Sequence, residues 1–441
     1  MKKIVISFVI FTTPIAAQAA GFALIEQSGS GMGNAYAGAA AVAEDASTIF
    51  FNPAGMTYLP DTQLVVAGHL IRPSADFNND GSHLSTLVPA PFRTTRGGDG
   101  GDAGDLAFVP NIFFAKSITP DVRLGLGISA PFGLKTEYTN SWVGRYHALK
   151  SELKTININP SIAFKASDQV SLGFGISAMR AEADLTSAVD FGTICGAFGG
   201  CGIGALPQRN DGKVTLKGDD WGWGWNAGAL FQVTSDTRIG LSYRSQVHQT
   251  LDGTVKYSNV PALLTASPNF ARGSINAKIT LPDSFSASAF HQVNDQWDIM
   301  GDVTWTHWSK FEELKAARDT GAVVTNVPEN WDNTYRVSTG VSYRYNDALK
   351  LRAGLAYDES PVPSKFRTPR IPDSDRTWLS FGANYKFTPT TSLDAGYTHI
   401  FVKDSNVNKV NDTTVAALKD TLKGDYDSSV DILSVQLTHN F

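Results

Sequence analysis

The C-terminal part of the sequence alternates between two kinds of side chain. In its final residues, "VDILSVQLTHNF", the apolar Leu433, Val435 and Leu437 occupy one parity, and the polar Ser434 and Gln436 occupy the other. A period of two is the pattern of a β-strand that has one apolar face. The alternation recurs in "YRVSTGVSYRY" (335–345), "LKLRAGLAY" (349–357) and "WLSFGANYKF" (378–387).

The arginines on the polar parity indicate which face meets lipid. Arg336, Arg344 and Arg352 would each cost roughly 2–4 kcal/mol at the midplane of a bilayer, whereas the aromatic and aliphatic parity would gain by contacting hydrocarbon. A barrel with an apolar outside and a polar inside satisfies both faces. The alternative is a soluble β-sandwich with the apolar parity inward, in which long Gly-rich strands of this number would be unusual.

Fourteen segments show strand character, and their connections alternate between tight turns such as "TPD" and "TSD" and loops of a dozen residues or more. Short periplasmic turns and long outer loops are typical of outer-membrane barrels, as is an even number of strands. We therefore predict an all-β membrane protein with a 14-stranded antiparallel outer-membrane β-barrel over 61–441. The expected strands lie near 62–71, 106–117, 121–131, 151–166, 169–184, 213–233, 236–257, 272–292, 296–310, 333–345, 348–359, 375–387, 391–403 and 428–441.

The N-terminus resembles an export signal. Lys2 and Lys3 precede a short apolar run, and Ala17-Gln18-Ala19 is a small-x-small cleavage site. We expect residues 1–19 to be a signal peptide; the alternative is a retained anchor. The mature chain would then lie in the outer membrane of a Gram-negative bacterium.

Residues 20–60 lack strand alternation and are rich in Gly and Ala, as in "GSGMGNAYAGAAAVAEDAS". Small side chains allow short helices and turns to pack closely, and a barrel of this strand number encloses a lumen that needs filling. We expect this segment to be an N-terminal helical plug, or hatch, in the lumen. The alternative is a flexible periplasmic leader, which would gain nothing from the apolar cluster around "IFFNPAGMTYL".

Cys195 and Cys201 lie close together in "CGAFGGC". In an exported protein a local disulfide is expected, and metal binding is the weaker interpretation because no His or acidic residues cluster beside them. The formal net charge of -5 argues against nucleic acid as a partner.

The stretch "GFALIEQSGSGMGNAYAGAAAVAEDASTIFFNPAGM" resembles the start of the FadL/TodX family of outer-membrane transporters for long-chain fatty acids and hydrocarbons. The segments "DESPVP" and "PDSDRTWLS" resemble that family as well, and the terminal Phe441 is similar to the signal by which the barrel-assembly machinery recognises such barrels. The resemblance covers the whole mature chain. It implies a monomeric barrel closed by a hatch, in a bilayer with lipopolysaccharide, and passive uptake of an apolar ligand that is captured outside, bound in the lumen and released sideways through the wall.

Two prolines fall inside expected strands, Pro110 in "FVPNIFF" and Pro160 in "INPSI". Proline cannot donate to a β-ladder, so these positions require local breaks in pairing. They flank the third strand, which contains Gly125 and Gly127. We expect the lateral opening in this region; harmless bulges near strand ends are the alternative.

Two outer loops, at 185–212 and near 258–271, carry apolar side chains that suit the capture of a ligand. In the resembled family these loops form a greasy groove; the alternative is that they pack on each other as a lid. The expected capture residues are Phe191, Phe198, Leu206, Leu263, Leu264 and Phe270.

A fatty acid needs a cation for its carboxylate, and Arg336, Arg344 and Arg376 are the expected headgroup residues. The family resemblance also implies a lysine shortly before the tenth strand, yet "GAVVTNVPENW" (321–331) has no basic residue. That absence favours the alternative of an uptake channel for aromatic or alkane hydrocarbons. We hypothesise that Asn52, Pro53 and Ala54 form part of the plug gate.

Two other classes of function fit the sequence less well. A general diffusion porin is disfavoured by the plug and by the apolar loops, and a lipid enzyme would need a nucleophile–base pair at the membrane rim. The sequence contains no convincing catalytic constellation, so no enzymatic activity, no cofactor and no metal are expected.

Overall fold

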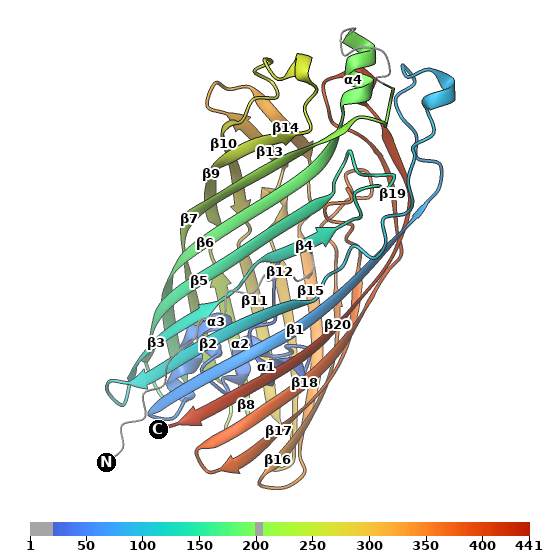
Figure 1. The fold of residues 1–441 in the computed structure, drawn as a ribbon. Coiled ribbons are helices and arrows are strands. Elements are labelled where there is room, and N and C mark those ends of the chain that lie inside the picture. Colours follow the sequence, from blue (N-terminus) through green and yellow to red (C-terminus); the bar gives the residue numbers. More distant parts are fainter. Residues whose placement is uncertain (1–20, 199–205) are drawn as a thin grey trace, which may run out of the picture.

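The computed structural model describes residues 21–198 and 206–441 (Figure 1). The predicted signal peptide and Cys201 lie outside the described residues. One antiparallel sheet closes on itself, because β1 pairs with β2 on one side and with β20 on the other. Closure joins the first strand to the last, and the predicted 14-stranded antiparallel barrel is confirmed.

Bulges and bends divide several of these strands, so that the sheet contains twenty labelled segments. The early segments are β1 (Thr62–Asn79), β2 (Ala107–Ser117), β3 (Val122–Ser129), β4 (Gly133–Glu137), β5 (Lys150–Lys165), β6 (Val170–Asp190), β7 (Asp211–Gln232), β8 (Thr237–Arg244), β9 (Val247–Ser258) and β10 (Gly273–Leu281). The later ones are β11 (Ser284–Gln292), β12 (Trp297–Thr306), β13 (Glu313–Arg318), β14 (Val323–Pro328), β15 (Thr334–Arg344), β16 (Leu349–Asp358), β17 (Arg376–Thr388), β18 (Thr391–Val402), β19 (Ser405–Val410) and β20 (Thr421–Asn440).

Short helices fill the lumen near the end of the barrel at which β1 starts and β20 finishes (Figure 1). They are α1 (Gly29–Met32), α2 (Ala39–Val42), α3 (Thr48–Phe51) and the 3₁₀ helix η1 (Pro53–Tyr58). The outer connections carry α4 (Phe191–Phe198) and the 3₁₀ turns η2 (Ala90–Phe92), η3 (Ala262–Leu264) and η5 (Ala416–Leu418). A further 3₁₀ turn, η4 (Trp308–Lys310), lies between β12 and β13. Across the described part of the chain, every helix is too short or too polar to cross a bilayer.

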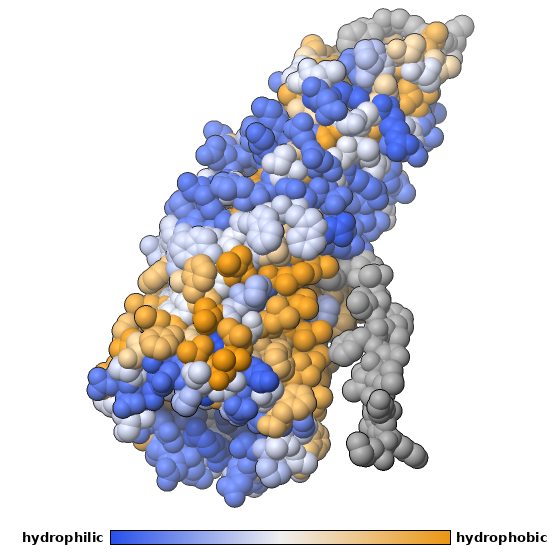
Figure 2. Space-filling model, turned by 90° about the vertical axis from the view of Figure 1, so that its left-hand side faces the viewer, coloured by the Kyte–Doolittle hydropathy of each residue, from blue (hydrophilic) through white to orange (hydrophobic). Residues whose placement is uncertain are grey.

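The predicted polarity of the two faces agrees with the observed burial. Leu433, Val435 and Leu437 on β20 are exposed on the outside, whereas Ser434 and Gln436 are buried. Figure 2 shows the resulting hydrophobic band on the side of the barrel that lies to the left in Figure 1. Exposed residues of that band include Leu124, Leu126, Ile128, Ile158, Ile162, Leu172, Phe174 and Ile176.

Several strands run beyond the ranges that alternation predicts. β20 begins at Thr421, β6 continues to Asp190, and the β13–β14 hairpin was not expected at all. These extensions lie toward the end of the barrel that carries the outer loops (Figure 1). Outside the bilayer neither face needs to be apolar, so the period-two signal fades while the hydrogen-bonded ladder continues.

The plug is seated on glycines of the barrel wall. A Cβ on Gly228 would lie 1.9 Å from Asn52 Oδ1, and one on Gly354 would lie 2.2 Å from the carbonyl carbon of Asn34. Such distances leave no room for a side chain, so the high glycine content of the strands reflects close approach of the plug. Similar contacts with the plug occur at Gly125, Gly173, Gly240, Gly340, Gly382 and Gly396.

Ion pairs also hold the plug to the wall. Glu44 of the plug accepts hydrogen bonds from Lys350 at 2.6 Å and from Arg352 at 2.7 Å, and Arg352 donates to Asp394 at 2.6 Å. Arg352 is buried, so its charge is compensated by two carboxylates rather than by water. A charge network therefore fixes the plug to strand β16 and, through Arg352, to Asp394 on β18.

Candidate functional site: a lumen cavity beside a break in the barrel wall

The third strand of the barrel is broken at Ala130, Pro131 and Phe132. β3 pairs with β5 up to Ser129, opposite Asn157, and β4 resumes at Gly133, opposite Lys154. Three residues therefore stand opposite two, which is a β-bulge. The side chain of Thr155 accepts from the Phe132 amide at 3.0 Å and donates to the Phe132 carbonyl at 2.6 Å.

The wall is incomplete on the other side of this break. β2 pairs with β1 from Ala107 to Lys116, but its pairing with β3 covers only Ile112–Ser117. Among the described strands, residues 107–111 of β2 thus have a partner on one side only. The unpaired stretch contains Pro110, which is one of the two prolines predicted to disturb the ladder.

The other predicted residues of this region lie in continuous sheet. Gly125 and Gly127 pair with both β2 and β5, so the strand does not break there; a Cβ on Gly125 would meet Met56 Sδ at 2.4 Å. At Pro160 the β5–β6 pairing lapses and resumes in the same register. There the Asn159 side chain donates to the Ile176 carbonyl at 2.9 Å in place of a backbone amide.

The N-terminal segment occupies the gap between β2 and the broken strand. Leu24 N donates to the Pro131 carbonyl at 2.7 Å, and Gly133 N donates to the Phe22 carbonyl at 2.9 Å. On the β2 side, Asn111 Nδ2 donates to the Glu26 carbonyl at 2.9 Å. Residues 22–26, the inserted segment, therefore connect β2 to the broken strand, with Ala23 and Phe132 as an isolated bridge pair.

Phe22 anchors this segment in an aromatic cluster. Its ring centroid lies 4.7 Å from that of Trp308, 5.4 Å from that of Phe311 and 5.5 Å from that of Trp331. The first two pairs are edge-to-face and the third is tilted, and favourable aromatic pairs add about 0.5–1.5 kcal/mol each beyond the burial of area. The cluster fixes the inserted segment to residues in the outer half of the lumen.

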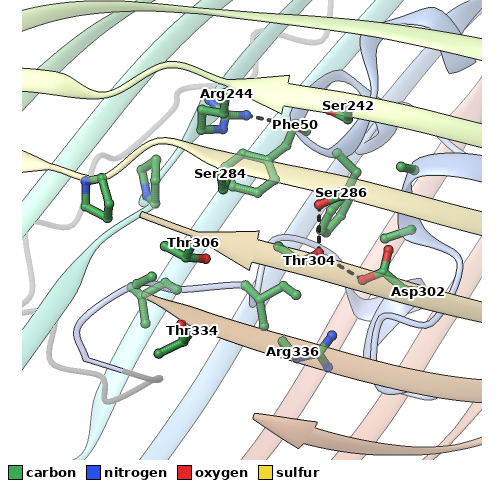
Figure 3. Close-up of a pocket in the computed structure, with 18 of the residues that line it drawn as sticks. Phe50, Ser242, Arg244, Ser284, Ser286, Asp302, Thr304, Thr306, Thr334 and Arg336 are labelled. Carbon is green, nitrogen blue, oxygen red and sulfur yellow. Dashed lines mark hydrogen bonds between the residues drawn. The ribbon is translucent and has the colours of Figure 1, made fainter. Parts of the chain in front are cut away.

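A cavity of about 140 Å³ lies between the plug, the break in β3 and the strands β8, β11, β12 and β15 (Figure 3). Its plug side is apolar, and its strand side carries hydroxyl groups, two arginines and two aspartates. Because Pro131 and Phe132 line it, the cavity reaches the break in the wall. The lining comprises Ala23, Leu24, Ile25, Ala39, Ala40, Phe50, Phe51, Pro131, Phe132, Ser242, Arg244, Pro282, Ser284, Ser286, Asp302, Thr304, Thr306, Trp308, Thr334, Arg336 and Asp358.

The structure separates the three arginines expected to bind a headgroup. Arg336 lines the cavity and donates to the Ala35 carbonyl of the plug at 2.6 Å. Arg344 instead pairs with Asp298 at 2.8 Å, and Arg376 pairs with Asp373; neither lines the cavity. Only Arg336 of the expected set therefore faces this cavity.

Arg244, which the sequence did not single out, is the second cation of the cavity. Its Nη2 donates to the Phe50 carbonyl at 2.8 Å, and its guanidinium carbon lies 4.2 Å from the centroid of the Phe50 ring. Its Nη1 is buried and has no hydrogen-bond partner among the described residues. The "YRS" segment gave no signal, since lumen-facing arginines are common in such barrels and only tertiary contacts distinguish them.

The plug also contains a buried acid beside the cavity. Glu26 is 0% exposed, and neither carboxylate oxygen has a hydrogen-bond partner in the described part of the chain. Burial raises the pKa of Glu26 to about 7, and the nearby Arg376 and Arg336 counteract part of this rise. Glu329, between β14 and β15, is similar: burial raises its pKa to about 8, against a hydrogen bond from Trp331.

Asn52, Pro53 and Ala54 join α3 to η1 and are buried against β6 and β7. The Asn52 side chain donates to the Ala40 carbonyl at 2.7 Å and to the Ala229 carbonyl on β7 at 3.0 Å. Its Oδ1 accepts from the Ala54 amide at 3.1 Å. In this structure the triplet is thus a fixed point of the plug.

The two outer loops touch each other. Phe191 is 0% exposed, and its ring lies edge-on to that of Phe270 at 5.1 Å. Leu206 and Leu264 are half-buried, while Leu263 is 68% exposed. Phe191 is consequently part of the packing between the loops rather than an exposed capture surface. The Phe198 side chain lies outside the described part of these loops.

Cys195 in α4 is disulfide-bonded. The second cysteine of the sequence, Cys201, lies outside the described residues. Within 21–198 and 206–441, no group of three or more His, Cys, Asp or Glu side chains is arranged to hold a metal ion.

Comparisons with known proteins agree with this architecture. Residues 10–441 match the family described as outer membrane protein transport protein (OMPP1/FadL/TodX). The chain is 33% identical to a long-chain fatty acid transport protein of Escherichia coli O6:H1, with 87% of each chain covered. It also superposes on a solved Pseudomonas aeruginosa FadL homologue with a TM-score of 0.87 and 27% identity, covering 96% of this chain and 100% of that one.

The P. putida toluene transporter TodX shares the fold at a TM-score of 0.65 and 18% identity, covering 90% of this chain and 94% of that one. The matching family confirms the predicted resemblance, the outer-membrane location and a role in transport rather than catalysis. The chain belongs to the OMPP1/FadL/TodX family of outer-membrane transport proteins.

Proposed function

We propose that this protein takes up long-chain fatty acids passively across the outer membrane, by loop capture, binding in the lumen, plug gating and lateral exit. The observation that carries the proposal is the cavity that touches both the plug and the break in β3. An apolar chain held there would lie directly behind the incomplete part of the wall. The similarity to a long-chain fatty acid transport protein at 33% identity supports this substrate class.

Capture would begin at the outer loops, where Leu263 offers an exposed apolar side chain. Inside, apolar and aromatic residues continue from the outer half of the lumen to the cavity, in a cluster that includes Leu251, Ile279, Trp308 and Phe132. A ligand could thus move inward while remaining in contact with apolar side chains.

The energy of burial requires a gate. At about 0.8 kcal/mol per methylene, a 16-carbon chain would gain on the order of 10 kcal/mol in a closed pocket. A rigid site of that strength would retain its ligand. Release therefore needs the inserted segment 22–26 to leave the break, with the anchored triplet Asn52-Pro53-Ala54 as the pivot of that motion.

The lateral route would lead between β2 and the β3–β4 bulge. Pro110 and Pro131 are both unable to donate there, so opening this part of the wall requires the loss of few backbone hydrogen bonds. The exit would open onto the hydrophobic band, and the ligand would pass from one apolar environment to another.

A second candidate is an uptake channel for aromatic or alkane hydrocarbons. Its support is the absence of a basic residue in 321–331, together with the fold that this chain shares with a toluene transporter. Competition of hexadecane and toluene against oleate for the purified protein distinguishes the two, because only a fatty-acid transporter prefers oleate.

The experiment that tests the proposal prevents segment 22–26 from leaving the break in β3. Ala23 and Phe132 are antiparallel bridge partners, flanked by the two backbone hydrogen bonds described above, so a disulfide in the Ala23→Cys/Phe132→Cys double variant would tie segment 22–26 to the break. Cells carrying the oxidised variant should lose oleate uptake and regain it on reduction.

Wild type with and without reductant is the control, since the bond of Cys195 would also be reduced. Undiminished uptake through the locked barrel would contradict the lateral route.

A further inference from the structure

We propose that Arg244 is the residue that selects for a carboxylate: it binds the ligand headgroup at its Nη1 and, through its contact with Phe50, connects headgroup binding to the plug. This inference rests on the proposed function and names the group that gives it specificity.

The first argument is the unused hydrogen-bonding capacity of Arg244. A guanidinium carries five N–H donors, yet Nη1 of Arg244 has no acceptor among the described residues, and Nη2 donates to Phe50. A buried donor without an acceptor destabilises the fold, and a charged donor does so more than a neutral one. The unpaired Nη1 of Arg244 therefore does not stabilise the fold, and a ligand that supplies an acceptor would satisfy it.

The second argument is the neutral surroundings of Arg244. Its partners on the adjacent strands are Ser284 on β11 and Asn226 on β7, both uncharged, and it makes no ion pair with any described residue. Arg336 differs, because Asp358 is its partner on β16 and its Nη2 is held by the plug. Nε of Arg336 also lacks an acceptor among the described residues, but a carboxylate approaching Arg336 would meet Asp358 on the adjacent strand, whereas the strand partners of Arg244 carry no charge.

The third argument is position. Figure 3 shows Arg244 and Arg336 on opposite sides of the cavity, with Arg244 joined to Phe50 by its hydrogen bond. Ser242, two residues before Arg244 on β8, and Ser284, the strand partner of Arg244 on β11, also line the cavity and would supply hydroxyl donors for a second carboxylate oxygen. A headgroup at Arg244 would leave the alkyl chain to extend over the apolar plug side toward Pro131.

The contact with Phe50 gives the bound headgroup a route to the plug. Phe50 lies in the only turn of α3, two residues before the C-cap Asn52, and its carbonyl is among those that a helix end leaves without an internal partner. A carboxylate attracts a guanidinium more strongly than a neutral carbonyl does. Binding of the headgroup would thus weaken the tether between Arg244 and α3, whereas an uncharged hydrocarbon would leave the tether intact.

The test compares oleate with oleyl alcohol, which has the same chain without the charge, on the purified mature protein. Arg244→Gln removes the positive charge, and Arg244→Lys keeps the charge but loses the planar pair of N–H donors. Arg344→Lys, which lies outside the cavity, is the matched control for the lysine substitution. A charge-assisted hydrogen bond of about 1.5–3 kcal/mol corresponds to roughly a 10- to 100-fold change in affinity. We expect Arg244→Gln to weaken oleate binding by that factor, Arg244→Lys by less, and Arg344→Lys not at all, with oleyl alcohol affinity unchanged throughout.

The second readout is amide exchange at residues 48–54. Oleate should accelerate exchange in wild type, oleyl alcohol should not, and the Arg244→Gln variant should exchange quickly with or without ligand. Equal losses of oleate and alcohol affinity in Arg244→Gln would overturn the assignment of Arg244, as would exchange in wild type that oleate leaves unchanged. Absence of oleate binding to wild type would instead overturn the proposed function itself.

Discussion

The side-chain amide of Asn52 donates to the backbone carbonyl of Ala229 at 3.0 Å, so that a plug residue is bonded directly to strand β7. The neighbouring Gly228 makes this possible, because a Cβ there would lie 1.9 Å from Asn52 Oδ1. The barrel wall and the plug are thus matched at the level of single atoms.

Gly228→Ala should displace Asn52 and loosen the plug, at a cost of about 1–3 kcal/mol for overpacking. The expected results are faster exchange of the Ala54 amide, which donates to Asn52, and higher ion conductance in planar bilayers. Gly301→Ala is the control, since the nearest atom to its Cβ would be the Ser338 carbonyl oxygen at 3.7 Å. Equal behaviour of the two variants would contradict the seating of the plug on Gly228.

Phe22→Ala should release the inserted segment from the break in β3. Loss of a buried phenylalanine costs about 3–5 kcal/mol, and here the loss falls on a segment held by few hydrogen bonds. The Leu24 and Gly133 amides should then exchange faster. The control is Phe77→Ala, because Phe77 is equally buried but belongs to a separate cluster; this variant should leave both amides protected. If both amides stay protected in Phe22→Ala, the aromatic cluster does not hold the segment.

Arg352→Met should destabilise the plug, because it leaves Glu44 and the buried Asp394 without their shared cation. Breaking a buried ion pair on one side typically costs about 3–5 kcal/mol. Lys350→Met, which removes the more accessible partner of Glu44, should cost less than about 1 kcal/mol. Thermal denaturation and bilayer conductance of the two variants measure the difference, and similar effects would mean that burial does not control this network.

Glu26 should make the retention of the inserted segment dependent on pH. Its pKa is about 7 in the folded protein against an ordinary value of 4.5, so between these values the folded state binds more protons than the unfolded one, and stability falls as pH rises from 4.5 to 7. The protection factor of the Leu24 amide, which corrects for the intrinsic rise of exchange with pH, should therefore be lower at pH 8 than at pH 5. Glu26→Gln, which does not titrate, should remove that contribution; an identical pH dependence in both proteins would exclude Glu26 as its source.

The barrel itself can be predicted from local pattern alone. Alternation on one strand, such as Leu433 against Ser434, follows from the opposite solvents on the two faces, and the arginines at 336 and 352 identify the inner face. The plug can be expected from its small residues. The strand glycines that contact the plug cannot be predicted, because each contact joins residues that lie far apart in the sequence.

The candidate site depends on tertiary structure. Pro110 is recognisable in the sequence as a position without a backbone donor. The bulge, however, lies at Ala130–Phe132, because β3 and β4 pair with β5 in registers that differ by one residue. Arg336, Arg344 and Arg376 are equivalent in sequence terms, yet packing gives two of them acidic partners away from the cavity.

Arg244 has a free donor because the plug places the Phe50 carbonyl at its Nη2, while no acceptor among the described residues lies within hydrogen-bonding distance of its Nη1. Local pattern thus dictates the alternation of polarity, since each strand must satisfy lipid and lumen residue by residue. Which polar groups of the lumen remain without a partner is fixed by packing, since it depends on which strands and plug segments meet.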